Sequence, residues 1–222
     1  MKRIKVVHII TDLCAGGAQM MLYKLLTLSD RNLFDPVVIS LMDKGRLSDR
    51  IEALNIPVYA INISSEKPSL ASIRSLISTV RQIKPDLLQG WLSHGNIAAQ
   101  LTSIFLFKPI PVVWNVRHLA LSKLDAKEQT LKISQLLAYL SYLPNKIIYN
   151  SKLGAAQHEQ IGYRHSKTTI IPNGFDTKVL TPFLAARTRV RAELNLAEDT
   201  FIISLFGRYD PVKDHLNFLK AA

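Results

Sequence analysis

Short apolar runs rich in valine and isoleucine alternate along this chain with longer segments in which apolar and polar positions mix. The first run, IKVVHII, has the almost continuous Val/Ile content of a strand that is buried on both faces of a parallel sheet. The pattern predicts strands at Ile4–Ile10, Pro36–Leu41, Val58–Ile61, Asp86–Trp91, Pro111–Val116, Lys146–Tyr149 and Thr168–Ile171.

The segments between these runs have the character of helices. Pro68 and Ser69 begin one of them, because proline fits the first turn, where its missing N–H has no helical partner. The strand–helix alternation repeats about six times and predicts an α/β fold with a doubly wound, Rossmann-like parallel sheet. Helices are expected at Ala18–Leu28, Leu47–Leu54, Ser69–Ile83, Asn96–Phe107, Lys127–Tyr142 and Ser151–Ile161.

The character of the chain changes after Pro172. Residues 173–182 are rich in turn formers, and residues 187–194 predict a polar helix. The run FIISLF at 201–206 predicts a new buried strand, with a helix beginning at Asp214. We therefore expect a complete N-terminal Rossmann-like domain at 1–176, an interdomain connection at 177–199 and the truncated start of a second Rossmann-like domain at 200–222.

The charge balance favours anionic partners. The 222 residues carry 28 Lys and Arg against 17 Asp and Glu, a formal net charge of +11. Such a surplus attracts phosphates, nucleic acid or acidic lipid headgroups. The basic residues are spread along the chain, without a basic tail or an RNA-recognition signature, so nucleic acid is not an expected partner.

Cysteine content and hydropathy predict a cytoplasmic protein. Cys14 is the single cysteine, so neither an internal disulfide nor a four-cysteine zinc site is expected. The N-terminal apolar stretch is short and lacks a small-residue cleavage site. The longest apolar stretch, Leu101–Trp114, is broken by a lysine and two prolines and falls short of the ~20 residues of a membrane span.

A glycine pair, Gly16–Gly17, follows the first predicted strand and opens the first predicted helix. In doubly wound sheets ligands bind at the carboxyl ends of strands, and a helix N-terminus there favours negative charge. The G-x-G-x-x-G fingerprint is absent, which disfavours dinucleotide binding. A plain turn is the alternative interpretation of the pair.

Two histidines follow neighbouring predicted strands. His94 comes after the fourth strand and His118 after the fifth, so both are expected to face one crevice. A neutral imidazole can exchange hydrogen bonds with a sugar hydroxyl near pH 7. Arg117 beside His118 suits an anionic group, with a structural ion pair as the alternative, and both histidines could equally be loop residues without a function.

Near the C-terminus the segment GRYDPVKDH joins a predicted strand to a predicted helix. Arg208 and Lys213 would direct two cations toward one spot, to which the helix N-terminus adds backbone donors. This combination suits a diphosphate. An ordinary strand–loop–helix connection with solvated charges is the alternative.

These segments together resemble glycosyltransferase family 4, the group 1 glycosyltransferases with the GT-B fold. The matching motifs, in the order of the family, are GGAQ (Gly16–Gln19), GWLSHGN (Gly90–Asn96), WNVRH (Trp114–His118), IYNS (Ile148–Ser151), IPNGFD (Ile171–Asp176) and GRYDPVKDH (Gly207–His215). The resemblance implies two Rossmann-like domains that face across a cleft, the N-terminal one for the acceptor and the C-terminal one for the sugar nucleotide. It also implies sugar transfer with retention, without a metal or another cofactor.

The resemblance assigns roles to the candidate donor-side residues. Gly16–Gly17 would lie near the donor phosphates, and Arg208 and Lys213 would hold the diphosphate. His118 would support the transferred sugar as a catalytic residue, with His94 on the neighbouring strand.

Acceptor binding falls to Gln19, Asn96 and Arg117 within the same motifs. One departure is that Arg117 stands between the fifth strand and His118, where the family histidine often follows the strand directly. A second is that the paired-glutamate motif for the donor sugar is expected beyond Ala222.

We therefore expect a retaining glycosyltransferase of the hexosyltransferase type in cell-envelope polysaccharide synthesis. Its partners would be a nucleoside-diphosphate sugar, a sugar- or lipid-linked acceptor and, at the inner face, an anionic membrane. Residues 1–222 alone are expected to show weak or no transfer. The alternatives are a non-catalytic basic Rossmann-like module that binds an anionic surface or a partner chain and, on fold grounds, a sugar-nucleotide epimerase.

Overall fold

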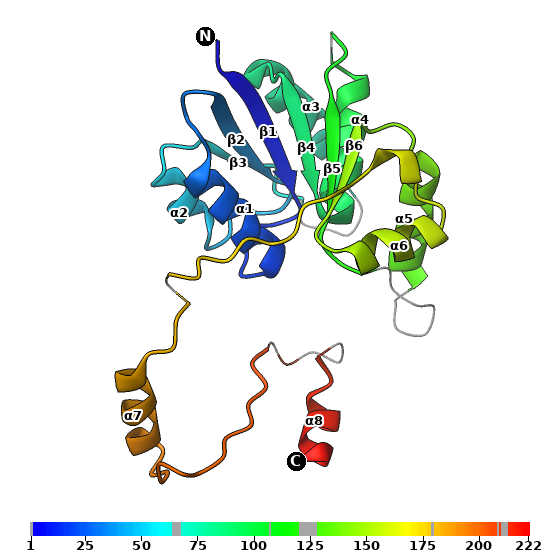
Figure 1. The fold of residues 1–222 in the computed structure, drawn as a ribbon. Helices are drawn as coiled ribbons and strands as arrows, with labels where there is room; N and C mark the ends of the chain where they lie inside the picture. Colours follow the sequence, from blue (N-terminus) through cyan, green and yellow to red (C-terminus); the bar gives the residue numbers. More distant parts are fainter. Residues whose placement is uncertain are drawn as a thin grey trace. The chain divides into compact units, whose positions relative to one another are not determined.

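The computed structural model describes residues 2–63, 68–106, 108–119, 128–178, 180–207, 209 and 213–222. It divides the chain into two compact units, Met1–Gly174 and Phe175–Ala222. The first unit holds the whole described sheet, and the second holds two helices joined by extended chain (Figure 1).

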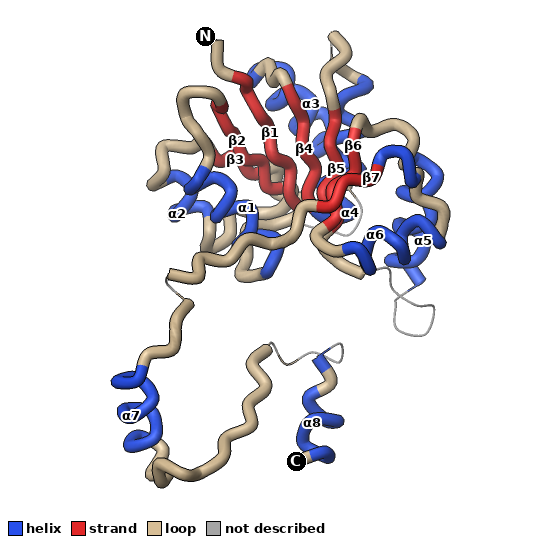
Figure 2. Tube along the Cα trace, in the orientation of Figure 1, coloured by secondary structure: helices blue, strands red, loops and turns tan. Residues whose placement is uncertain are grey.

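The first unit is built on one seven-stranded sheet in which every described pair of neighbouring strands is parallel. The strand order is β3-β2-β1-β4-β5-β6-β7, and the strands lie side by side in Figure 2. The predicted α/β, doubly wound fold is confirmed. The strands are β1 (Ile4–Ile10), β2 (Phe34–Ser40), β3 (Val58–Ala60), β4 (Leu87–Trp91), β5 (Val112–Val116), β6 (Lys146–Tyr149) and β7 (Thr168–Ile170).

The strand order reverses between β1 and β4. From β1 the chain moves outward through β2 to β3, and from β4 it moves the other way through β5 and β6 to β7. Ile10 pairs with Trp91, which pairs with Asn115, so these three strands end at one edge of the sheet. Ligand crevices of doubly wound sheets form at such a switch point.

Helices cover both faces of the sheet. Inward-facing residues of α1 and α2 join a core with Ile10 and Trp91, whereas the other face packs α3, α4, α5 and α6 around Ile9 and Trp114. The helices of the first unit are α1 (Gly17–Leu28), α2 (Ser48–Glu52), α3 (Leu70–Ile83), α4 (Leu92–Ile104), α5 (Glu128–Leu140) and α6 (Lys152–Gln160), with a short 3-10 turn, η1 (His165–Lys167).

The first turn of α4 packs directly on the sheet at the switch point. A Cβ atom at Gly90 of β4 would lie 2.5 Å from the Asn96 Cα, and one at Gly95 would lie 2.4 Å from the carbonyl oxygen of Ile9. Both obstacles are backbone atoms, so a side chain has no room at either position. Two glycines therefore let α4 approach the backbones of β1 and β4.

Helix α4 begins four residues before the predicted start at Asn96. Strand β4 ends at Trp91, and Leu92 takes a left-handed backbone conformation with φ of 63° that turns the chain at once into the helix. His94 is therefore in the first turn of α4 and not in a loop.

The second unit contains α7 (Leu184–Glu193) and α8 (His215–Ala221). The predicted strand at 201–206 is wrong, because this segment is extended without ladder pairing. Its aromatic side chains are exposed, Phe201 by 86% and Phe206 by 94%. A strand forms only beside a hydrogen-bonded neighbour, and the described part of this unit offers none.

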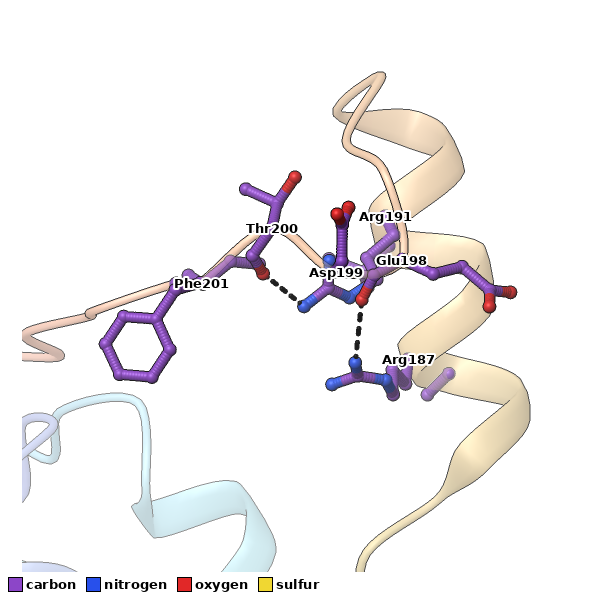
Figure 3. A pocket seen from close by; sticks show the side chains of 9 residues that line it. Arg187, Arg191, Glu198, Asp199, Thr200 and Phe201 are labelled. Atoms are coloured by element: carbon purple, nitrogen blue, oxygen red, sulfur yellow. Dashed lines mark hydrogen bonds between the residues drawn. The ribbon is translucent and has the colours of Figure 1, made fainter.

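Two arginines of α7 hold the segment that follows it (Figure 3). Arg191 is buried and donates hydrogen bonds to the carbonyl oxygens of Ala197 and Thr200, the latter at 2.7 Å. Arg187 donates to the carbonyl oxygen of Glu198 at 3.2 Å. These bonds satisfy backbone acceptors of a turn that lacks regular structure.

A substitution at Gly95 tests the close contact of α4 with the sheet. We expect Gly95→Ala to lower the free energy of unfolding by about 1–3 kcal/mol, because the added methyl group meets backbone that must move. Urea unfolding followed by circular dichroism measures this. Gly17→Ala is the matched control, since a Cβ there has nothing within 4 Å. Equal stabilities of the two variants would contradict the packing argument.

Candidate functional site

Three segments follow β1, β4 and β5, whose arrows in Figure 1 all point toward the carboxyl edge of the sheet. They are the loop and the start of α1 after β1, the start of α4 directly after β4, and residues 117–119 after β5. These segments carry the sequence-predicted site residues of the first unit: Gly16, Gly17, Gln19, His94, Asn96, Arg117 and His118.

The loop after β1 is closed by Asp12. One oxygen of its carboxylate accepts a hydrogen bond from the Cys14 N–H at 2.9 Å and another from the Gln19 side-chain amide at 3.0 Å. The Gln19 side chain is buried and is turned into this loop. Gln19 thus bonds within the loop in this structure, and its role in binding the acceptor stays a prediction.

The glycine pair opens α1. Gly16 is the extended residue before the helix and makes no side-chain cap, and Gly17 begins the helix with open space around its missing Cβ. The first N–H groups of a helix have no intrahelical acceptor. The turn therefore presents unscreened backbone donors, as an anionic ligand requires.

Gly45 supports the same loop from the side, a role that no motif indicated. Its φ of 63° is left-handed, and a Cβ there would lie 2.6 Å from the Leu13 carbonyl carbon. Backbone bonds from Met42 to Thr11 and from Leu47 to Leu13, both 3.0 Å, join the two loops. A glycine between polar residues was the available signal, and it was too weak to interpret from one sequence.

A buried histidine lies beneath the switch point. The Trp91 indole N–H donates to His8 Nδ1 at 3.3 Å, and Gln89 bonds the same ring. Burial lowers the pKa of His8 to about 4, since the interior disfavours the imidazolium. Sequence reasoning passed over His8, although a histidine inside an otherwise apolar strand was visible.

Arg117 follows the end of β5, and its guanidinium contacts three side chains from different segments. Its guanidinium donates to the Asn173 side-chain oxygen at 2.6 Å and to the Asn115 side-chain oxygen at 3.4 Å. The guanidinium carbon also lies 5.4 Å from the Trp91 ring centroid, within the range of a cation–π contact. Partial burial lowers the Arg117 pKa from its usual value.

Asn96 is a structural residue in this fold. Only 1% of it is exposed, and its side-chain oxygen accepts a hydrogen bond from the Asn115 N–H at 3.1 Å. This bond joins α4 to β5. The burial that satisfies the β5 backbone leaves little of the Asn96 side chain at the surface, and its role in acceptor binding stays a prediction.

The two predicted histidines differ in their surroundings. His94 is exposed on the first turn of α4. His118 is half-buried, with its ring edge-on to the buried His158 at 5.4 Å between centroids. His158 donates from Nδ1 to the Gly154 carbonyl oxygen at 2.8 Å. Burial and then the neighbouring His158 lower the His118 pKa to about 4, so both rings are neutral near pH 7.

The predicted diphosphate residues belong to the second unit. Arg208 lies outside the described residues. Lys213 is exposed just before α8, where its side chain passes close to Gly207.

The two described pockets lie away from the strand ends. One is formed by α7 and the segment around Phe201 in the second unit (Figure 3), and the other by residues 162–166 of the first. Neither contains a sequence-predicted site residue.

Comparison with known proteins identifies the family. The profile of Glycosyltransferase Family 4 matches residues 15–179, which is most of the chain. The chain belongs to Glycosyltransferase Family 4. The matched region begins at the glycine loop and ends beyond Asn173, so it contains all seven predicted site residues of the first unit.

Relatives of the chain are longer than it is. It is 24% identical over 229 residues to the Escherichia coli UDP-Gal:alpha-D-GlcNAc-diphosphoundecaprenol alpha-1,3-galactosyltransferase, covering 99% of this chain and 57% of the relative. The chain thus spans little more than half the length of this family member.

Solved structures agree in fold. Anabaena HepE (Alr3699) in complex with UDP and glucose superposes with a TM-score of 0.80 at 21% identity, over 99% of this chain and 57% of that one. A glycosyltransferase from Rickettsia africae gives 0.69 at 14% identity, over 100% and 57%. Identities this low establish the shared fold only.

No helix in the described part of the chain has the length and apolar character needed to cross a membrane. Among the same residues, no three or more His, Cys, Asp and Glu side chains gather as metal ligands do.

The buried histidines predict a pH dependence of stability. His8 has a pKa of about 4 when folded and 6.5 in a model peptide, so the unfolded chain takes up a proton first as the pH falls. The contribution of His8 to the free energy of unfolding is complete above pH 6.5. It is lost as the pH falls toward 4, at up to about 1.4 kcal/mol per pH unit. We expect urea midpoints to fall over this window.

His8→Gln separates this group from the others. Glutamine keeps an acceptor for Trp91 but does not titrate, so the slope of stability against pH should decrease by the share of one histidine. His118 and His158 continue to contribute in the variant, because burial lowers their pKa values also. An unchanged slope in His8→Gln would exclude His8 as a source of the pH dependence.

Proposed function

We propose that the protein to which this chain belongs transfers a sugar from a uridine-diphosphate sugar to a hydroxyl acceptor, with retention at the anomeric carbon and without a metal. The observation that carries the proposal is the family match over residues 15–179, in which the glycine loop, α4 and the end of β5 meet at the switch point. The E. coli relative is named as a transferase that uses UDP-Gal. HepE was crystallised in complex with UDP-glucose, and that structure superposes on this chain with a TM-score of 0.81.

The N-terminus of α1 supports a role for the glycine loop in donor binding. Gly16–Gly17 leaves the first backbone N–H groups of the helix open, and no side chain caps them. A phosphate oxygen would be stabilised there by direct hydrogen bonds and by the helix dipole. In this proposal the loop binds the side of the diphosphate that faces the acceptor.

His118 is the proposed contact to the transferred sugar. Because its pKa is about 4, its ring is neutral at pH 7 and can accept or donate a hydrogen bond to a sugar hydroxyl. His94 is proposed as a second, exposed contact from α4. With Gln19 and Asn96 held in structural bonds, acceptor selection passes to exposed groups of these loops.

Arg208 and Lys213 are proposed to neutralise the leaving diphosphate. Charge stabilisation of the departing group is the largest single contribution in many transferases. Because the chain spans 57% of its relatives, we propose that the active protein continues beyond Ala222 and that the donor-sugar carboxylates lie there.

The proposed acceptor is lipid-linked, in cell-envelope polysaccharide synthesis. The E. coli relative acts, by its name, on a diphosphoundecaprenol-linked sugar. The formal charge of +11 would draw a cytoplasmic protein to an anionic membrane surface. Peripheral contact with the inner face of the membrane is therefore part of the proposal.

Donor titration tests whether residues 1–222 contain a donor site. We expect calorimetry with UDP to give dissociation constants weaker than about 1 mM for these residues, because few donor contacts are present. A protein extended to the length of its relatives should bind in the micromolar to millimolar range. Stoichiometric micromolar binding by the 222-residue chain would contradict the division of the site.

Transfer assays on the extended protein test the roles of individual residues. We expect Arg208→Ala to lower kcat by about 100-fold, since the leaving diphosphate loses a cation. Arg189→Ala on α7 is the matched control, because Arg189 is largely exposed and pairs with Glu193 in the same helix. Transfer of radiolabelled sugar from UDP-sugars to a lipid extract is the measurement, and an unaltered kcat in Arg208→Ala would rule out the proposed role.

A further inference from the structure

Arg117 joins segments that are far apart in the sequence. Its guanidinium contacts Trp91 at the end of β4, Asn115 in β5 and Asn173 beyond β7. The bond to Asn173 is short at 2.6 Å and spans 56 residues. Hydrogen bonds to a charged donor are roughly twice as strong as neutral ones.

Asn173 lies at the point where the chain leaves the first unit. The unit ends at Gly174, and the Ile171 N–H makes a backbone bond to Tyr149 at 2.9 Å. Between residues 171 and 178, Asn173 alone is partly buried, while the others are exposed. The partly buried residue of this exit segment is thus the one that is hydrogen-bonded to Arg117.

The same arginine is connected to α4. The Asn115 N–H donates to the Asn96 side chain, and the Asn115 side chain accepts from Arg117. A continuous path of hydrogen bonds thus runs from the first turn of α4, which carries His94, through β5 to Asn173. Asn96 and Asn115 are buried, and Arg117 and Asn173 are partly buried.

We propose that Arg117 is a positioning residue that ties the exit segment, residues 171–174, to the carboxyl ends of β4 and β5. The start of α4 with His94, the loop with His118 and the start of the connection then behave as one rigid body. Its consequence for sugar transfer rests on the proposed function, whereas the anchor itself concerns residues 1–222 alone. This assignment replaces the acceptor role predicted for Arg117, because its guanidinium already has protein partners.

Amide exchange in the 222-residue protein tests the anchor. We expect Arg117→Met and Asn173→Ala each to accelerate exchange of the Ile171 amide by about tenfold or more, since one charged hydrogen bond is lost. Chymotryptic cleavage after Phe175 should accelerate also. The double variant should exchange no faster than Arg117→Met alone, because Asn173→Ala removes a bond that Arg117→Met has already removed.

Two controls separate anchoring from general loosening. Arg81→Met removes another arginine that bonds a distant carbonyl, that of Phe105, and should leave the Ile171 amide unchanged. The Leu88 amide, bonded to Pro111 within the sheet, should exchange at one rate in all folded variants. Asn173→Asp keeps the acceptor oxygen and adds an attractive charge, so it should retain protection at Ile171.

The outcomes decide the proposal without reference to catalysis. Wild-type exchange at Ile171 in both Arg117→Met and Asn173→Ala would overturn it. Parallel acceleration at Ile171 and Leu88 would overturn it too, because that indicates lost global stability and no local anchor. If Arg117→Met does not fold, the exchange rate of the Ile171 amide is compared between Asn173→Ala and Asn173→Asp. This comparison tests the same hydrogen bond from its other partner.

Discussion

The close contact between the first turn of α4 and the sheet is the constraint on which the candidate site depends. Gly90 and Gly95 remove the side chains that would hold the helix away from the backbones of β1 and β4. The helix therefore starts at the switch point itself, directly after Trp91. This placement brings Asn96 against the end of β5 and puts His94 at the edge where ligands of such sheets bind.

Polar residues at this edge divide into those that build the site and those that face solvent. Buried polar groups require partners, and here Gln19, Asn96 and Arg117 find them in Asp12, Asn115 and Asn173. What remains for a ligand is the open N-terminus of α1 and the two histidines. The open N-terminus of a helix favours a negatively charged group, and a neutral imidazole can exchange hydrogen bonds with a hydroxyl group.

Sequence patterns were sufficient for the fold of the first unit and for the family. All seven predicted strands of that unit exist, because buried parallel strands leave a continuous Val/Ile signal that does not depend on distant residues. The same signal misled at 201–206, where an apolar run has no neighbouring strand to pair with. The start of α4 was also misplaced, since the left-handed turn at Leu92 has no glycine to reveal it.

The sequence by itself determined the succession of strands and helices in the first unit, the family and the set of polar residues at the strand ends. Only the tertiary structure decided which of those residues form hydrogen bonds within the protein and which are exposed. The reason is that a side chain's partner is chosen by distance in space, and Arg117 and Asn173 lie 56 positions apart yet share a hydrogen bond of 2.6 Å. Hydrophobic periodicity is a local property that can be predicted from the sequence, whereas the partners of polar side chains depend on the tertiary structure.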